Sequence, residues 1–176
     1  MLLRKLNAVL ALLTTALLMN HAISLGAWML SRGSISFAIN KLPWVMLWLM
    51  AAHAVISIAL AVLGHKGAEK REVKEYAKLN ASTVFQRMSG ILLILFTALH
   101  VLGTVGVLTP PPAVHAILPP LFFAFTLAHV AVSTSKAFIT LGIGNAKFIK
   151  VADVFVKVLC GVTLVIDVAG FYLFLV

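Results

Sequence analysis

Four histidines set within apolar stretches are the residues of this chain best suited to chemistry. They are His21, His53, His100 and His129, and each interrupts a different long apolar run. An ionisable side chain at bilayer depth is costly, so each is a candidate functional site. A neutral imidazole is a good metal ligand, and two from facing helices fill the two axial positions of a haem iron. The four histidines therefore predict two bis-imidazole haem sites.

Depth in the membrane sorts these histidines into two pairs. A helix rises about 1.5 Å per residue, which places His21 and His100 roughly 22 and 18 Å from the inner membrane boundary. The same count places His53 and His129 roughly 15 and 9 Å from it. We therefore expect the first two to hold an outer haem and the last two to hold an inner haem.

The elements that carry the histidines are expected to be membrane-spanning helices. Apolar residues make up 62% of the chain and charged residues 11%. Runs of about 20 apolar residues can cross a hydrocarbon core of roughly 30 Å, and in lipid such runs must be helical. We predict an all-α, polytopic five-helix bundle that forms a single domain over residues 1–176. Its predicted helices are Leu6–Leu30, Leu42–Leu63, Met88–Leu108, Ala116–Thr134 and Val151–Val176.

The distribution of basic residues predicts a cytoplasmic N-terminus. In that orientation eleven lysines and arginines lie inside, and only Arg32 and Lys41 lie outside. The first run has the basic start of a signal peptide, but its length favours a mature helix. The hydrophilic stretch 65–86 is expected as a cytoplasmic loop, with a short amphipathic helix on the membrane surface around Glu69 and Tyr76. No aromatic-rich basic face accompanies the net charge of +9, which argues against nucleic-acid binding.

Hydroxyl groups and small residues accompany the four histidines, and each set has two interpretations. A hydroxyl follows each histidine by about one turn, and it either accepts the second ring N–H or bonds back to its own helix. These hydroxyls belong to Ser24, Ser57, Thr104 and Ser133. Small side chains let a flat macrocycle approach, or simply let helices pack closely. They are Gly26, Ala51, Ala52, Gly90 and Gly103.

Other polar groups give weaker predictions. Gln86, Arg87 and Ser89 are candidates to bind a haem propionate or a quinone, although Arg87 also suits an interfacial arginine that reaches toward lipid headgroups. Asp153 and Lys157 are expected to form a local ion pair. Asp167 is expected to be protonated and hydrogen-bonded, or else to take up protons near an outer quinone. The single Cys160 is expected to be packed and inert, and Trp28, Trp44 and Trp48 are expected to form an aromatic belt near the outer face.

One segment resembles a known family motif. Val84–Gly90, followed by His100–Val101, is similar to the Q-R-[VM]-[ST]-G…H-V signature of cytochrome b membrane anchors. These anchors belong to succinate dehydrogenases and quinol–fumarate reductases. The resemblance extends to the other helices through Met19–His21, His53–Val55, His129 and Ile139–Ile143. It covers nearly the whole chain.

The resemblance implies a five-helix, single-chain anchor with two b haems. The inner haem would take ligands from the second and fourth helices, and the outer haem from the first and third. It also implies a flavoprotein subunit with covalent FAD and an iron–sulfur subunit, both docked on the cytoplasmic face of a bacterial or archaeal membrane. The dicarboxylate site would lie on a partner chain, and a quinone, expected to be menaquinone, would react here. The chain departs from some relatives because Ser31–Lys41 contains no acidic residue.

Two alternatives remain open at the level of the sequence. A diheme anchor of another quinone-linked dehydrogenase would keep the haems and change the partner. A non-redox helical transporter or scaffold would use the histidines only as hydrogen bonds between helices. The direction of electron flow, the oligomeric state and the residues of any catalytic site are not predicted.

Overall fold

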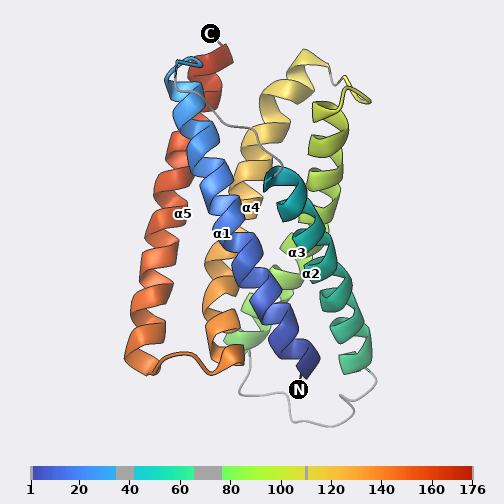
Figure 1. Ribbon diagram of the computed structural model, residues 1–176, viewed down its shortest axis with the longest axis vertical. Coiled ribbons are helices and arrows are strands. Elements are labelled where there is room, and N and C mark those ends of the chain that lie inside the picture. Colours follow the sequence, from blue (N-terminus) through green and yellow to red (C-terminus); the bar gives the residue numbers. More distant parts are fainter. Residues whose placement is uncertain (1, 35–41, 66–76, 110, 176) are drawn as a thin grey trace.

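The computed structural model describes residues 2–34, 42–65, 77–109 and 111–175. Within these ranges the chain forms five α-helices and no strand. Each helix is long and apolar enough to span a membrane, which confirms the all-helical, five-helix prediction (Figure 1). The helices are α1 (Leu2–Leu30), α2 (Leu42–His65), α3 (Ala77–Thr104), α4 (Pro112–Leu141) and α5 (Ala146–Leu175).

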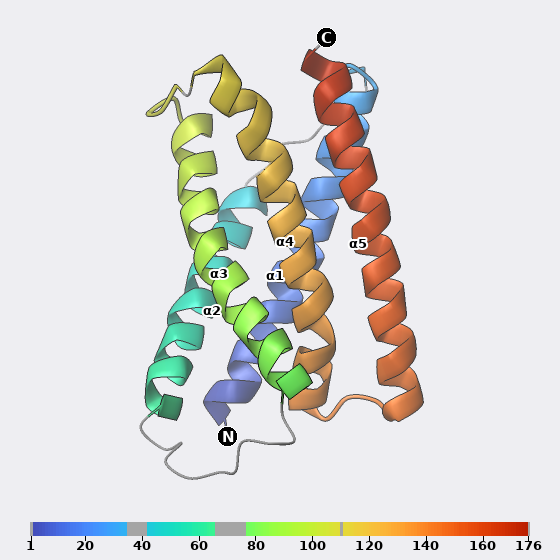
Figure 2. The same cartoon turned by 180° about the vertical axis from the view of Figure 1, so that it is seen from behind.

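The five helices do not pack uniformly. α1, α4 and α5 each pack against the other two, whereas the extensive contacts of α2 are with α1 and those of α3 are with α4. Figure 2 shows α2 and α3 on the side of the bundle away from α5. The N-terminus lies at one end of the bundle and the C-terminus at the other (Figure 1). The helices that carry His53 and His100 are therefore attached at the margin of a three-helix core.

The apolar core lies where α1, α4 and α5 meet. Met19, Leu127, Val130 and Cys160 form its central buried cluster. Cys160 is only 4% exposed, as predicted for a packed thiol. Among the described side chains, α2 contributes no fully buried residue and α3 contributes only Ser89. The core therefore positions His21 and His129, which lie on two of its helices.

The third helix begins earlier than its hydropathy predicts. α3 starts at Ala77 rather than Met88, so the second half of the predicted loop 65–86 is helical. The added residues include Asn80, Ser82 and Gln86, which a hydropathy count excludes but a helix at a membrane edge tolerates. α3 also ends at Thr104 rather than Leu108. The predicted amphipathic helix between 69 and 76 lies outside the described residues.

The fourth and fifth helices are also longer than predicted. α4 begins at Pro112, so Pro119 and Pro120 lie inside it rather than near its start. A proline in a helix removes one backbone hydrogen bond, and α4 bends in this part of its course (Figure 2). α4 continues to Leu141 and ends at Gly142, whose φ of 74° is the left-handed conformation that favours glycine. α5 begins at Ala146 rather than Val151.

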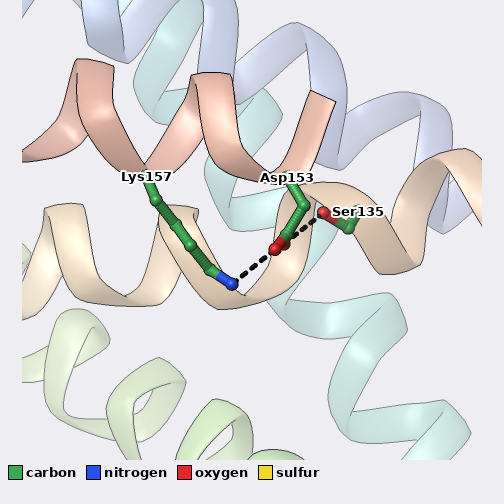
Figure 3. A network of polar contacts seen from close by, with 3 residues as sticks. All are labelled: Ser135, Asp153 and Lys157. Carbon is green, nitrogen blue, oxygen red and sulfur yellow. Dashed lines mark hydrogen bonds and ion pairs between the residues drawn. The ribbon is translucent and has the colours of Figure 1, made fainter. Parts of the chain in front are cut away.

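A polar network joins α4 to α5 near the end that holds the N-terminus (Figure 3). Asp153 Oδ2 accepts from Lys157 Nζ at 2.5 Å, which confirms the predicted ion pair. Asp153 Oδ1 accepts from Ser135 Oγ on α4 at 2.7 Å. The carboxylate of Asp153 therefore has a partner on each helix.

Candidate functional site

His53 on α2 is held by a hydrogen bond to the backbone of α1. Its Nδ1 lies 3.3 Å from the carbonyl oxygen of Asn7. A carbonyl can only accept, so Nδ1 carries the hydrogen and Nε2 keeps its lone pair. The side chain of Asn7 also binds Ser57, one turn after His53, through its amide nitrogen at 3.0 Å. One residue of α1 therefore sets both the position and the tautomer of His53.

His129 on α4 is held in the same tautomer by a different kind of group. Ser89 Oγ on α3 donates to the Phe85 carbonyl at 2.7 Å, which uses its only hydrogen. With that hydrogen at the Phe85 carbonyl, the contact of 2.8 Å between Ser89 Oγ and His129 Nδ1 is assigned as a bond that the imidazole donates. Ser89 is 1% exposed, so water does not compete for this bond. His129 therefore also keeps the lone pair of Nε2.

These two imidazoles lie near each other. His129 lies within electrostatic range of His53 across the space between α4 and α2. Gly90 on α3 faces the same ring, because a β-carbon at that position would lie 3.4 Å from His129 Cε1. Both rings use Nδ1 for a hydrogen bond, so the pair offers two Nε2 lone pairs. That is the form in which neutral imidazole binds a metal.

His21 and His100 form a second pair. His21 on α1 lies within electrostatic range of His100 on α3. The His100 ring packs on Phe122 of α4, with ring centroids 5.4 Å apart. Phe96 lies against the same wall, 6.1 Å from Phe122 and 5.8 Å from Phe125. His100 faces α1 and α4 and is nevertheless exposed, so the described side chains do not enclose its ring.

The predicted hydroxyl partners are not the ones that hold the imidazoles. Ser133 donates to the carbonyl of His129 and Thr104 to that of Val101, so both bond back to their own helices. Ser57 contacts Asn7 rather than a ring, and no bond from Ser24 to an imidazole is found among the described contacts. The hydroxyl that binds a ring is that of Ser89. The sequence instead suggests Ser89 as a group that binds a propionate or a quinone.

The small residues differ in their surroundings, and close helix packing explains some of them better than the approach of a macrocycle does. Gly26 faces α5, where a β-carbon would lie 2.6 Å from Asp167 Oδ1 and 2.7 Å from Ile166 Cγ2. It serves close helix packing rather than a macrocycle. Gly90 lies beside His129, whereas a β-carbon at Gly103 would meet nothing within 4 Å. Ala51 and Ala52 are exposed.

Gln86 and Arg87 have different surroundings. Arg87 is exposed and has no hydrogen-bond or ion-pair partner among the described residues, which suits the interfacial interpretation. Gln86 is half-buried and accepts from Lys136 Nζ on α4 at 2.9 Å. Lys136 lies within electrostatic range of His129. Sequence reasoning missed Lys136 as a site residue, because its fifty-residue separation from Gln86 gives no local signal.

Asp167 lies outside both histidine pairs. It is 1% exposed between α5 and α1, and its Oδ1 has no hydrogen-bond partner among the described residues. The hydrogen bond expected for this oxygen is therefore not found. Trp44 and Trp48 are exposed as a belt requires, whereas Trp28 packs on Phe174 with ring centroids 4.8 Å apart.

The donor set suits haem better than a bare metal ion. The described residues contain no group of three or more His, Cys, Asp or Glu side chains that could hold an ion by themselves. Haem iron needs only two protein ligands, because the porphyrin supplies the other four. Paired imidazoles with Nδ1 engaged and Nε2 available meet that requirement at the His53–His129 site.

No family model, curated protein or solved structure matches this chain. The site is therefore interpreted from its own geometry.

Proposed function

We propose that this chain is a diheme cytochrome b membrane anchor that passes electrons between an iron–sulfur partner and a quinone. The observation that carries the proposal is that His53 on α2 and His129 on α4 lie within electrostatic range of each other, each with Nδ1 engaged in a hydrogen bond to another helix. The inner haem b would be held by this pair and the outer haem b by His21 and His100. When bound, each haem supplies reversible one-electron transfer at its iron.

The protein's own residues have defined tasks in this proposal. Asn7 and Ser89 hold the inner rings by their Nδ1 atoms, which leaves each ring one direction in which to ligate. Phe96, Phe122 and Phe125 form an apolar wall along one side of His100. An apolar surrounding tunes the potential of a bound redox centre.

The resemblance of Val84–Gly90 to the family motif is the basis for the complex that we propose. The chain would be the anchor of a succinate:quinone oxidoreductase or quinol:fumarate reductase in a bacterial or archaeal cytoplasmic membrane, with its N-terminus inside. A flavoprotein subunit with FAD and an iron–sulfur subunit would dock at the end that holds the N-terminus. The quinone would be menaquinone. An anchor of another quinone-linked dehydrogenase would differ only in the docked partner.

A non-redox helical protein is the second candidate, because one observation favours it. The bonds from His53 to Asn7 and from His129 to Ser89 join two helices each, as purely structural histidines would. Such a role needs only one nitrogen of each ring. It gives no reason for two such rings to lie within electrostatic range of each other.

A visible spectrum of the purified chain separates the two candidates. The proposal predicts a b-type α band after reduction with dithionite, and reduction of the same band by a menaquinol analogue. A preparation of folded protein with no α band would support the non-redox candidate. Co-purification of a flavoprotein, followed by assay with succinate and with other substrates, would then identify the dehydrogenase.

A further inference from the structure

A pair of side chains beside the inner histidines is rich in hydrogen-bond donors. Lys136 Nζ donates to Gln86 Oε1 at 2.9 Å and so joins α4 to α3. This bond uses one lone pair of the Gln86 amide oxygen, and it leaves the NH₂ group of Gln86 and two N–H bonds of Lys136 as donors for a ligand. We call Lys136 and Gln86 the donor pair. Its ligand must be an acceptor.

The charge of the donor pair has no counter-ion in the described part of the chain. The ion pair found there joins Lys157 to Asp153, and the other oxygen of Asp153 is bound by Ser135. Lys136 is half-buried and its bonded partner is a neutral amide. A partly buried ammonium is stabilised most by a carboxylate or a phosphate. An anion is therefore the ligand that this pair fits best.

The position of the donor pair indicates which anion it would bind. Lys136 acts electrostatically on His129, two helical turns away on α4. Gln86 lies one turn before Ser89, which binds the same imidazole. A ligand at the donor pair therefore lies next to whatever the inner histidines hold.

We infer that Lys136 and Gln86 form a carboxylate-binding site for a propionate of the inner haem. This inference rests on the proposed function. It replaces the exposed Arg87 with Lys136 as the cation of the inner site. Lys136 supplies a charge-assisted bond, and Gln86 both holds the ammonium in place and adds a neutral donor.

The test combines a change in the protein with a change in the ligand. The full chain in phosphatidylcholine vesicles is loaded with iron protoporphyrin IX or with its dimethyl ester, in which the carboxylates are blocked. Excess apo-globin is added, and the rate at which haem moves from the chain to the globin is measured. Only the part of the absorption spectrum that is lost in His129→Ala is used, because that part reports the inner haem. The wild type should retain the free acid about 10- to 100-fold longer than the ester, the range of a charge-assisted hydrogen bond.

Variants of the donor pair should remove that discrimination. Lys136→Met should release the free acid and the ester at nearly equal rates, and Lys136→Arg should restore much of the difference. Lys150→Met is the matched control, because Lys150 is an exposed lysine of α5 near the same end of the bundle. Gln86→Glu keeps the size of the side chain and supplies an internal carboxylate to Lys136, so it should also weaken discrimination.

Three results would overturn the inference while leaving the proposed function intact. In the first, the wild type retains the free acid and the ester equally long. In the second, Lys136→Met still retains the free acid longer than the ester by the wild-type factor. In the third, the effect of Lys136→Met on retention depends on the phosphatidylglycerol content of the vesicles and not on whether the carboxylates are esterified. The last result would assign the donor pair to a lipid phosphate. Failure of the wild type to bind either porphyrin would instead overturn the proposed function.

Discussion

The α1–α4–α5 side of the bundle and the α2–α3 side are held together by different interactions. Among the described residues, all eight buried apolar side chains lie on α1, α4 and α5. α2 is tied to α1 by the bonds of Asn7, and α3 is tied to α4 by the bonds of Ser89 and Gln86. The first side holds this apolar core and two side-chain hydrogen bonds between α4 and α5, from Ser135 to Asp153 and from Tyr172 to Ala116, whereas the second concentrates its polar bonds at the inner histidines.

This difference indicates which side of the bundle a bound group would stabilise most. Helices in lipid gain little from the hydrophobic effect and associate through packing and hydrogen bonds. The packed side meets that need with its own side chains. The α2–α3 side leaves His100 exposed and His53 half-buried, so it gains most from a group bound between the helices.

The largest expected effect comes from removing an inner ligand. His129→Ala should lose one of two b haems, because the iron would lose an axial ligand, and the His21–His100 haem should remain. The measurement is haem per chain from the reduced spectrum. His115→Ala is the matched control on the same helix, since His115 stacks on Phe171 at 6.0 Å and belongs to neither pair. Equal haem content in His129→Ala and wild type would remove His129 as a ligand.

The second largest effect is expected from the hydroxyl of Ser89, which binds the His129 ring, in comparison with that of Ser133, which does not. Ser89→Ala removes the acceptor of the His129 Nδ1–H and should weaken haem retention about 10- to 100-fold. It should also raise the midpoint potential of the inner haem, because an imidazole without this bond is a weaker electron donor. Ser133→Ala deletes a hydroxyl one turn from the same histidine that bonds only its own helix. Identical potentials in the two variants would contradict this role.

A third comparison uses two glycines. Gly26→Ala should lower the free energy of unfolding by about 1 to 3 kcal/mol, because the new methyl group would meet Asp167 and Ile166 at the packed α1–α5 contact. Gly103→Ala, on the α2–α3 side, should raise it by up to about 1 kcal/mol through helix propensity. Unfolding in mixed detergent measures both. A larger loss at Gly103 than at Gly26 would reverse the comparison.

The smallest effect is expected at the network in Figure 3. The side chain of Lys157 is 54% exposed and its ion pair with Asp153 joins residues of a single helix. Lys157→Met should change the free energy of unfolding by less than about 0.5 kcal/mol and leave the haem spectrum unchanged. A change in the haem spectrum of Lys157→Met would show that this network influences the inner haem site.

The sequence predicted the features that depend on one helix at a time. Apolar runs located five helices, and the spacing of Asp153 and Lys157 predicted their ion pair. Helix ends were predicted poorly where polar residues continue a helix beyond its apolar part, as at Ala77, or where prolines lie inside it, as at Pro119. Contacts across helices were missed, because Asn7 lies 46 residues from His53 and Ser89 lies 40 from His129.

The pyridine haemochrome stoichiometry of the purified full-length chain tests the central claim most directly. Two paired sets of imidazoles predict two b haems per polypeptide, and loss of either pair should reduce the value to one. A well-folded preparation with a value near zero would contradict the account, since the four histidines would then serve only to join helices.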